Sequence, residues 1–367
     1  MRDIMQNIIV FGTGKYYEYK KESMEKKYNI VYFLDNKVEV GSFALYQNTE
    51  IKIFNPMDID RKDNTVIFLM SVHFISMWKQ LCEIGIAPER IVFPYDEAPF
   101  FENDDALCHC LKEIRFSMGY VECIRKSQEA VRISNEAEWR TFLRSAYRDR
   151  YPLINAVAQM ETEPISRQFG TERGAPIDRH YIEVMLADHS DYIRGDVLEI
   201  EDNTYTMQFG GDKVQQSIVM DVSSTDSNVS FNGNIETGQG IRDEIADCFI
   251  LTQTLMYIYN LGSAAHNIMR LLKKGGTALI TCSGISQNSR RCMDNYGCYF
   301  NFNADVFVRM FEKESNAQVL ETGSFGNVKT VSAHLNGLCS EDLVEEDFVP
   351  NDKYYPLIVY AVVKKNG

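Results

Sequence analysis

Short apolar runs alternate with segments of helical apolar spacing in residues 1–100 of the chain. Most of these runs are bounded by Gly, Asp, Asn or Pro, which favours strands. Strands that are apolar throughout and separated by helices are typical of parallel sheets covered on both faces. We therefore predict a mostly parallel α/β domain over residues 1–100, with strands at Asn7–Gly12, Asn29–Asp35, Thr65–Met70 and Arg90–Pro94.

The same alternation returns in residues 171–367, which we predict to form a second α/β domain. Helices are predicted near Arg179–His189 and Ala304–Glu314, and the last two strands of the domain can pair antiparallel. The predicted strands are Asp196–Ile200, Ser217–Val222, Cys248–Leu251, Thr277–Cys282, Gln318–Glu321 and Leu357–Val363. Residues 101–170 are predicted to be a helical connector or lid, because helical spacing covers Asp105–Ser127 and Glu136–Tyr151.

Composition agrees with two globular domains in 367 residues, with 45% apolar and 25% charged residues. A net charge of −14 argues against a nucleic-acid partner, because affinity for phosphate backbones comes mainly from cations. The nine cysteines are odd in number and form no CxxC pair, which favours reduced thiols and a cytoplasmic location. Cys108, His109 and Cys110 lack a second ligand pair, so no metal site is predicted. The longest uncharged segment, Cys248–Met269, has a polar middle, so no membrane insertion is expected.

The first glycine-rich loop, GTGKYY at Gly12–Tyr17, follows a predicted strand and precedes a predicted helix. Gly12 and Gly14 match the first two glycines of GxGxxG, but Tyr17 stands where the third would allow close helix packing. Asp35 lies where an acidic residue would bind a ribose. The loop therefore leaves two interpretations open, a ligand site or a scaffold domain resembling the Rossmann-like domains found beside sugar-modifying enzymes.

The second candidate loop is EIEDNTYT, Glu199–Thr206, at the end of a predicted strand. Later come the segment DCFILTQTLMYI, a helix that ends in LLKKGG, and the strand TALITC. This order resembles the class I S-adenosylmethionine-dependent methyltransferases. The resemblance implies two Rossmann-like units joined by the connector, with S-adenosyl-L-methionine as the cofactor of the second unit.

The resemblance also implies which residues hold the cofactor. Glu199 matches the acidic position of the family's first motif, where acidic-x-Gly-x-Gly is usual. Glu201, Asp202 and Asn203 replace the glycines, and the two carboxylates would hold the cofactor's ammonium group. The resemblance also implies that Asp221 contacts the cofactor's ribose and that Asn234 contacts its adenine. Thr252 and Gln253 would border the transferred methyl group.

A narrower resemblance covers the last two hundred residues, through segments such as RGAPIDRHYIEVML, SGISQNSRRCMDNYGCYFNF and SFGNVKTVSAHLNGL. It is to a bacterial methyltransferase group associated with glycosyltransferases, and it implies O-methylation of a saccharide-containing or small-metabolite acceptor. The implied acceptor side holds Arg173, Arg179, Tyr181, Ser283, Gln287 and Tyr299. His334 and Asp294 are the candidates for a catalytic base, and no motif fixes either of them.

Two alternatives stay open. One is a non-catalytic binding or scaffold protein on a degenerate methyltransferase fold, which the missing glycines favour. The other is an oxidoreductase that uses the first domain with a nicotinamide, which Tyr17 disfavours. Association into a homo-oligomer is neither predicted nor excluded by the sequence.

Overall fold

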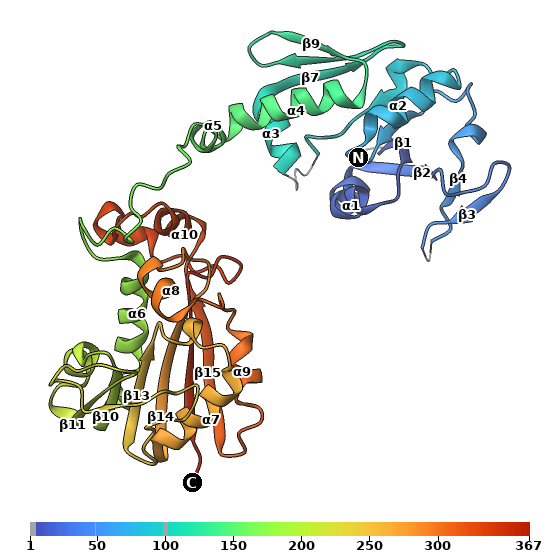
Figure 1. The fold of residues 1–367 in the computed structure, drawn as a ribbon. Coiled ribbons are helices and arrows are strands. Elements are labelled where there is room, and N and C mark those ends of the chain that lie inside the picture. The colour runs from blue at the N-terminus through green and yellow to red at the C-terminus, as the bar shows by residue number, and fades with distance from the viewer. Residues whose placement is uncertain (1–4, 48, 98–101) are drawn as a thin grey trace. The chain divides into compact units, whose positions relative to one another are not determined.

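The computed structural model describes residues 5–47, 49–97 and 102–367, without the side chains of residues 102, 103 and 291. The chain divides into two compact units, Met1–Met160 and Glu161–Gly367 (Figure 1). Each unit has its own sheet, and each is described by itself below.

The first unit is built on a six-stranded sheet in the order β3-β4-β2-β1-β5-β6. All neighbouring strands are parallel except β3 and β4. The strands are β1 (Gln6–Phe11), β2 (Tyr28–Leu34), β3 (Phe43–Leu45), β4 (Lys52–Phe54), β5 (Val66–Leu69) and β6 (Ile91–Val92). The helices are α1 (Lys15–Lys27) and α2 (Phe74–Glu83), with 3-10 turns at Pro56–Asp58 and Pro88–Arg90. The predicted mostly parallel α/β domain is confirmed.

The region that follows differs from the predicted helical connector. Helix α3 (Glu102–Cys110) ends early, and an antiparallel sheet of β7 (Leu111–Phe116), β8 (Val121–Arg125) and β9 (Ala130–Ile133) replaces the helix predicted over Asp105–Ser127. That helix prediction is wrong beyond Cys110.

The strands form there because buried Val121 and Cys123 alternate with partly exposed neighbours, which is strand periodicity. Helix α4 (Glu136–Arg150) confirms the other helix predicted in this region, and α5 (Leu153–Ala158) follows it. Leu111, Val121, Ile133 and the apolar face of α4 belong to the same buried cluster as the first sheet. The first unit therefore extends to Met160.

The second unit is a seven-stranded sheet in the order β12-β11-β10-β13-β14-β16-β15. The strands are β10 (Gly195–Ile200), β11 (Val214–Asp221), β12 (Phe231–Asn232), β13 (Ala246–Thr252), β14 (Leu272–Ser283), β15 (Ala317–Phe325) and β16 (Ile358–Lys365). Five strands run parallel, and β16 lies antiparallel between β14 and β15, as predicted for the last two strands. The α/β fold of two Rossmann-like units is confirmed.

Helices cover both faces of this sheet (Figure 1). Helices α7 (Leu261–Leu271) and α9 (Asp305–Phe311) pack on one face, against strand residues such as Leu198, Phe249 and Ile280. Helices α6 (Ile177–Asp188) and α10 (Val328–Leu335) pack on the other, against Val197, Ile250 and others. Alternate residues of each strand feed the two cores, as the pleat requires. Helix α8 (Arg290–Tyr296) lies in the connection from β14 to α9.

Candidate functional site

The parallel strands of the second unit end at one edge of the sheet, which we call the carboxyl edge. It carries Glu201 and Asp202 after β10, Asp221 at the end of β11, Thr252 and Gln253 at the end of β13, and Ser283 at the end of β14. The chain proceeds from β10 outward to β12 and then returns to β13 on the other side of β10. In open α/β sheets such a switch point opens a crevice beyond the strand ends, where ligands bind.

The loop after β10 is held by Glu199. The Glu199 carboxylate accepts hydrogen bonds from the backbone N–H of Tyr205 (3.2 Å) and Thr206 (2.8 Å) and from Thr206 Oγ1 (2.7 Å). Burial raises the pKa of Glu199, although these hydrogen bonds work against the shift. Glu199 thus fixes the loop from within.

Glu201 is the residue where the loop turns. Its φ is +70°, in the left-handed region that side chains rarely adopt and that glycine tolerates. The exposed Asp202 accepts a hydrogen bond at 2.8 Å from the Thr204 N–H, and Asn203 donates to Ser217 Oγ at 3.0 Å. At Glu201 the chain therefore keeps a backbone conformation that favours glycine, although the residue there bears a carboxylate.

Asp221 and Asn234 both serve local turns. Asp221 Oδ1 accepts from the Ser223 N–H at 2.9 Å, and the half-buried side chain remains at the strand end. Asn234 Oδ1 accepts from the N–H groups of Glu236 (2.8 Å) and Thr237 (3.0 Å). The acceptor atom of Asn234 is thereby engaged within its own turn.

Gln253 is the second strained residue at this edge, with φ +48°. Its Oε1 accepts from Ser283 Oγ at 2.8 Å, and its backbone N–H donates to the Thr281 carbonyl at 2.9 Å. Gln253, which was predicted to border the cofactor, and Ser283, which was predicted to bind the acceptor, are therefore in direct contact. Residues in sparsely populated backbone regions persist where the surroundings enforce them, which is common at ligand sites.

Buried polar atoms without a hydrogen-bond partner gather at the same place. Among the side chains of the second unit that the structure describes, such atoms are Gln253 Nε2, Thr281 Oγ1, Gln287 Nε2 and His334 Nδ1. Each belongs to the segment Thr281–Gln287 or to a residue hydrogen-bonded to it. Buried polar groups are normally paired, so this concentration indicates a place where a ligand or water completes the bonding.

His334 is one of the two predicted base candidates, and it lies fully buried on α10 with its Nε2 2.9 Å from Ser286 Oγ. Burial lowers the pKa of His334, so the ring is neutral at rest. Our sequence analysis missed Ser286, because its only distinguishing feature is contact with a residue 48 positions away. The other candidate, Asp294, is exposed on α8 and faces Arg290 at 3.7 Å.

Three residues predicted for the acceptor side are engaged elsewhere. Arg173 binds Asp342 at 2.7 Å and the Gly337 carbonyl at 3.1 Å, which ties two loops together. Tyr181 is buried in the core and lies 3.2 Å from Thr330 Oγ1. Arg179 contacts the Tyr205 hydroxyl and ring, and so meets the loop that Glu199 holds.

The other predicted acceptor residues flank the loop after β14. Tyr299 is exposed and packs edge-on to Tyr259, while Gln287 carries one of the unpartnered buried atoms. Of the predicted acceptor side, the structure therefore brings Ser283 and Gln287 together with the unpartnered atoms at the carboxyl edge.

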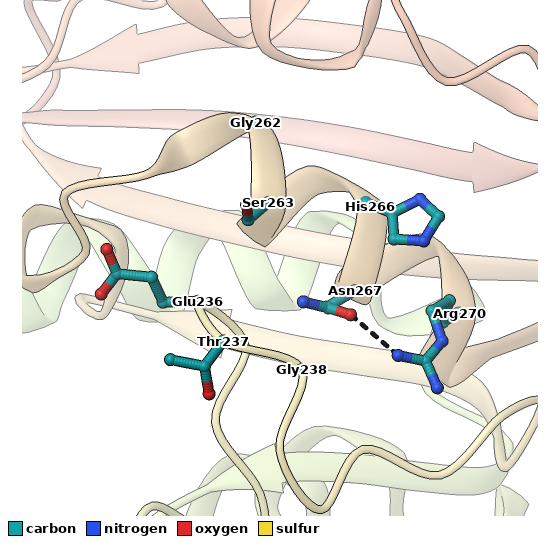
Figure 2. A pocket seen from close by; sticks show the side chains of 8 residues that line it. All are labelled: Glu236, Thr237, Gly238, Gly262, Ser263, His266, Asn267 and Arg270. Carbon is teal, nitrogen blue, oxygen red and sulfur yellow. Dashed lines mark hydrogen bonds between the residues drawn. The ribbon is translucent and has the colours of Figure 1, made fainter.

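A groove of about 450 Å³ lies along α7, and Figure 2 shows the side chains that line it. Its charged groups already have partners. Arg270 binds Asp243 (2.7 Å) and Asn267 (3.1 Å), His266 faces Glu314 (3.3 Å), and Glu236 accepts from the Asn260 N–H (3.0 Å). The groove includes no predicted cofactor residue, so the carboxyl edge is the stronger candidate site.

The glycine loop of the first unit is occupied by its own side chains. Tyr17 is fully buried against Phe33, in the place where a third glycine would bring the helix close. Asp35 accepts from Thr13 Oγ1 at 2.6 Å and from the Lys37 N–H at 3.0 Å. Both carboxylate oxygens of Asp35, the residue predicted to bind a ribose, therefore accept hydrogen bonds from neighbouring residues. This disfavours the alternative in which the first domain binds a nicotinamide.

Two features are absent from the described part of the chain. No group of three or more His, Cys, Asp or Glu side chains there is placed to hold a metal ion. None of the helices there combines the length and the apolar character needed to cross a membrane.

Comparison with known proteins gave structural similarities only, since no protein-family model and no curated protein sequence matches the chain. An S-adenosylmethionine-dependent methyltransferase from Mesorhizobium loti is 10% identical, with TM-score 0.34, over 52% of this chain and 98% of its own. The N-methyltransferase NodS from Bradyrhizobium japonicum, in complex with S-adenosyl-L-homocysteine, is 12% identical, with TM-score 0.35, over 55% and 94%. The cyclase SpnF is 13% identical, with TM-score 0.33, over 60% and 94%. These values are too low to transfer a function.

Proposed function

We propose that the second unit is an S-adenosyl-L-methionine-dependent methyltransferase. The observation that carries the proposal is the chemistry of the carboxyl edge at the switch point. Two strained residues, Glu201 and Gln253, follow the adjacent strands β10 and β13 at the switch point, and the buried unpartnered atoms gather beside Gln253. The carboxylates of Glu201, Asp202 and Asp221 lie at the same carboxyl edge of the sheet.

The side chains present suit this cofactor. The exposed carboxylates of Glu201 and Asp202 can bind its ammonium group, and Asp221 can accept hydrogen bonds from its ribose hydroxyls. The unpartnered Gln253 Nε2 is a free donor for a carboxylate or hydroxyl oxygen. When bound, the cofactor supplies a methyl group already activated on a sulfonium. The residues of the chain then have to orient an acceptor, exclude water and take up a proton.

The proposed acceptor is a hydroxyl of a saccharide-containing molecule or small metabolite, methylated on oxygen. The sequence resemblance to the glycosyltransferase-associated group supports it. Ser283, Ser286 and Gln287 also support it, because hydroxyl and amide side chains are the partners that a polyhydroxylated acceptor needs. On this proposal the protein works in the cytoplasm on a small-molecule or saccharide partner.

Calorimetric titration with S-adenosyl-L-homocysteine tests the cofactor assignment. We expect saturable binding by the wild type and a loss of about 10–100-fold in affinity for Asp221→Ala, since hydrogen bonds to a charged group contribute about 1.5–3 kcal/mol. Asp226→Ala is the matched control, because exposed Asp226 caps a similar turn, accepting from the Asn228 N–H at 2.9 Å. The absence of binding by the wild type would overturn the proposal.

The second candidate function is a non-catalytic binding or scaffold protein. The side chains at Glu201, Asp202 and Asn203 favour it, because they occupy space that glycines leave open to a cofactor. Mass spectrometry of small molecules released from the purified protein separates the two candidates. A released sulfur nucleoside supports the methyltransferase, and its absence together with a flat titration supports the scaffold.

A further inference from the structure

The pair formed by Ser286 and His334 has a hydrogen-bond pattern that the fold alone does not account for. Ser286 lies in the loop after β14, and His334 lies on α10 with an exposed fraction of 0%. The Ser286 hydroxyl has one hydrogen and two acceptors in reach, His334 Nε2 at 2.9 Å and the Gln287 carbonyl at 3.1 Å. Whichever acceptor takes that hydrogen, His334 Nδ1 has no partner.

A buried nitrogen without a hydrogen-bond partner destabilises the folded state, because it loses its bonds to water and gains none in the protein. A histidine that served packing alone could be replaced by an apolar side chain without that penalty. Burial lowers the pKa of His334, the negative charge of Asp178 on α6 works against that shift, and the Phe169 ring packs 5.5 Å away.

The pair is connected to the carboxyl edge by a short segment. Ser286 is separated by two residues from Ser283, which donates to Gln253 at the switch point. Backbone bonds from Gly284 to the Leu357 carbonyl (2.8 Å) and from Ile285 to the Pro356 carbonyl (2.7 Å) fix the residues between them. Ser286 is partly exposed while His334 is fully covered, so an acceptor at this edge meets the serine and not the histidine.

We propose that Ser286 takes the proton of the acceptor hydroxyl and passes its own proton to His334 Nε2. This inference rests on the proposed function. As the acceptor oxygen bonds to the methyl carbon, the electrons of the carbon–sulfur bond return to sulfur and the acceptor proton goes to Ser286 Oγ. Ser286 is then the catalytic residue, and His334 is a positioning residue that acts through it.

Nitrogen NMR of histidine-labelled full-length protein tests the relay without a known acceptor. The chain has six histidines, so comparison with His334→Gln, or with His334→Asn if that variant does not fold, assigns the His334 ring. S-adenosyl-L-methionine and S-adenosyl-L-homocysteine differ by one methyl group and by the charge on sulfur. The sulfonium charge disfavours the imidazolium. We therefore expect the His334 ring resonances to titrate at a lower pH in the S-adenosyl-L-methionine complex than in the S-adenosyl-L-homocysteine complex.

Ser286→Ala should move the His334 Nε2 resonance by removing its hydrogen-bond partner. His189, at the far end of α6, is the internal control and should stay unchanged between the two complexes. If both nucleosides bind while the His334 resonances are identical in both complexes and indifferent to Ser286→Ala, the relay is overturned and the proposed function stands. If neither nucleoside binds in calorimetry, the proposed function falls and the relay falls with it.

Discussion

Two residues at the carboxyl edge, Glu201 and Gln253, hold backbone conformations that are unfavourable for side chains. At φ +70° and +48°, each raises the free energy of the folded state by about 1–2 kcal/mol relative to a relaxed residue. They follow the adjacent parallel strands β10 and β13, so the strain is concentrated at the switch point of the sheet. A residue that keeps its side chain despite such backbone strain is best explained by a functional role of that side chain.

Glu201→Gly separates strain from function. Glycine adopts this φ freely, but it also gains freedom in the unfolded chain, so we expect a net stabilisation of about 0.5–1 kcal/mol. The urea midpoint should rise with an unchanged slope. We expect weaker binding of S-adenosyl-L-homocysteine in calorimetry, because the ligand's ammonium group loses a carboxylate.

Glu201→Gln is the matched control, because it keeps the strained backbone and removes only the charge. It should bind as weakly as Glu201→Gly without the gain in stability. Wild-type affinity in both variants would mean that Glu201 does not touch the cofactor.

Sequence reasoning placed residues at strand ends well, and it was weaker on what each side chain contacts. Asp221 and Gln253 could be placed at the carboxyl edge because apolar runs end visibly beside them. The partners of Arg173 and Tyr181 lie more than a hundred positions away in sequence, in segments where local patterning carries no trace of the contact. The Ser286–His334 pair escaped prediction for the same reason.

At the scale of elements, an ion cluster joins the starts of β10, β13 and β14. Lys273 Nζ lies 2.6 Å from Asp196 Oδ2 and 2.8 Å from Asp247 Oδ2, and Asp247 also accepts from the Asp196 N–H at 2.8 Å. Hydrogen bonds from Lys273 to Asp196 and Asp247 raise the pKa of Lys273. Burial alone would raise the pKa of Asp247, but its hydrogen bond from Lys273 leaves that pKa below the ordinary value. The cluster stabilises the sheet at the edge opposite the candidate site.

Lys273→Met should lower the free energy of unfolding by about 1 kcal/mol at pH 7, a modest value because these side chains are partly exposed. A depressed carboxylate pKa gives stability that is present above the unfolded pKa and is lost as pH falls through the folded one. The difference between variant and wild type should therefore shrink below about pH 4. Urea unfolding at a series of pH values measures this difference in the free energy of unfolding.

Lys274→Met serves as the control, because the neighbouring Lys274 is exposed and the described residues offer it no ion pair. A difference that stays constant from pH 7 to pH 3 would contradict the role assigned to the cluster. Cofactor affinity should be unchanged in both variants, since the cluster and the carboxyl edge lie at opposite ends of the strands.

The elements that sequence reasoning predicted were those with long uniform patterns. The long buried strands of both sheets and helix α4 were found, whereas β3, β4, β7–β9 and β12 were missed. Short strands such as β7 carry too few alternations to be told from a helix, and α3 directly before them extended the apparent helical spacing. Packing against the first sheet decides their form, and that contact is not local in sequence.

At the scale of the whole molecule, the chain has separate cores. One buried cluster uses residues from Ile8 to Ala146, and the other two use residues from Ile177 to Val363, without a shared member. Residues 161–163 between the units are exposed, while the Ile165 N–H donates to the Asn336 carbonyl of the second unit at 2.9 Å. A unit with its own core and sheet has what independent folding requires.

Limited digestion with a glutamate-specific protease should therefore cut first at Glu161 or Glu163 and release two stable fragments. The carboxyl-terminal fragment keeps every residue of the carboxyl edge, so we expect its affinity for S-adenosyl-L-homocysteine to stay within about twofold of the intact chain, because the ligand contacts are unchanged. Calorimetry on the purified fragment measures this, with intact protein as the reference. A fragment that folds cooperatively yet binds tenfold more weakly would mean that residues before the cut contribute to the cofactor site. Preserved affinity would mean that the first unit does not bind the cofactor. It would then bind the acceptor, bind a partner or serve as a scaffold.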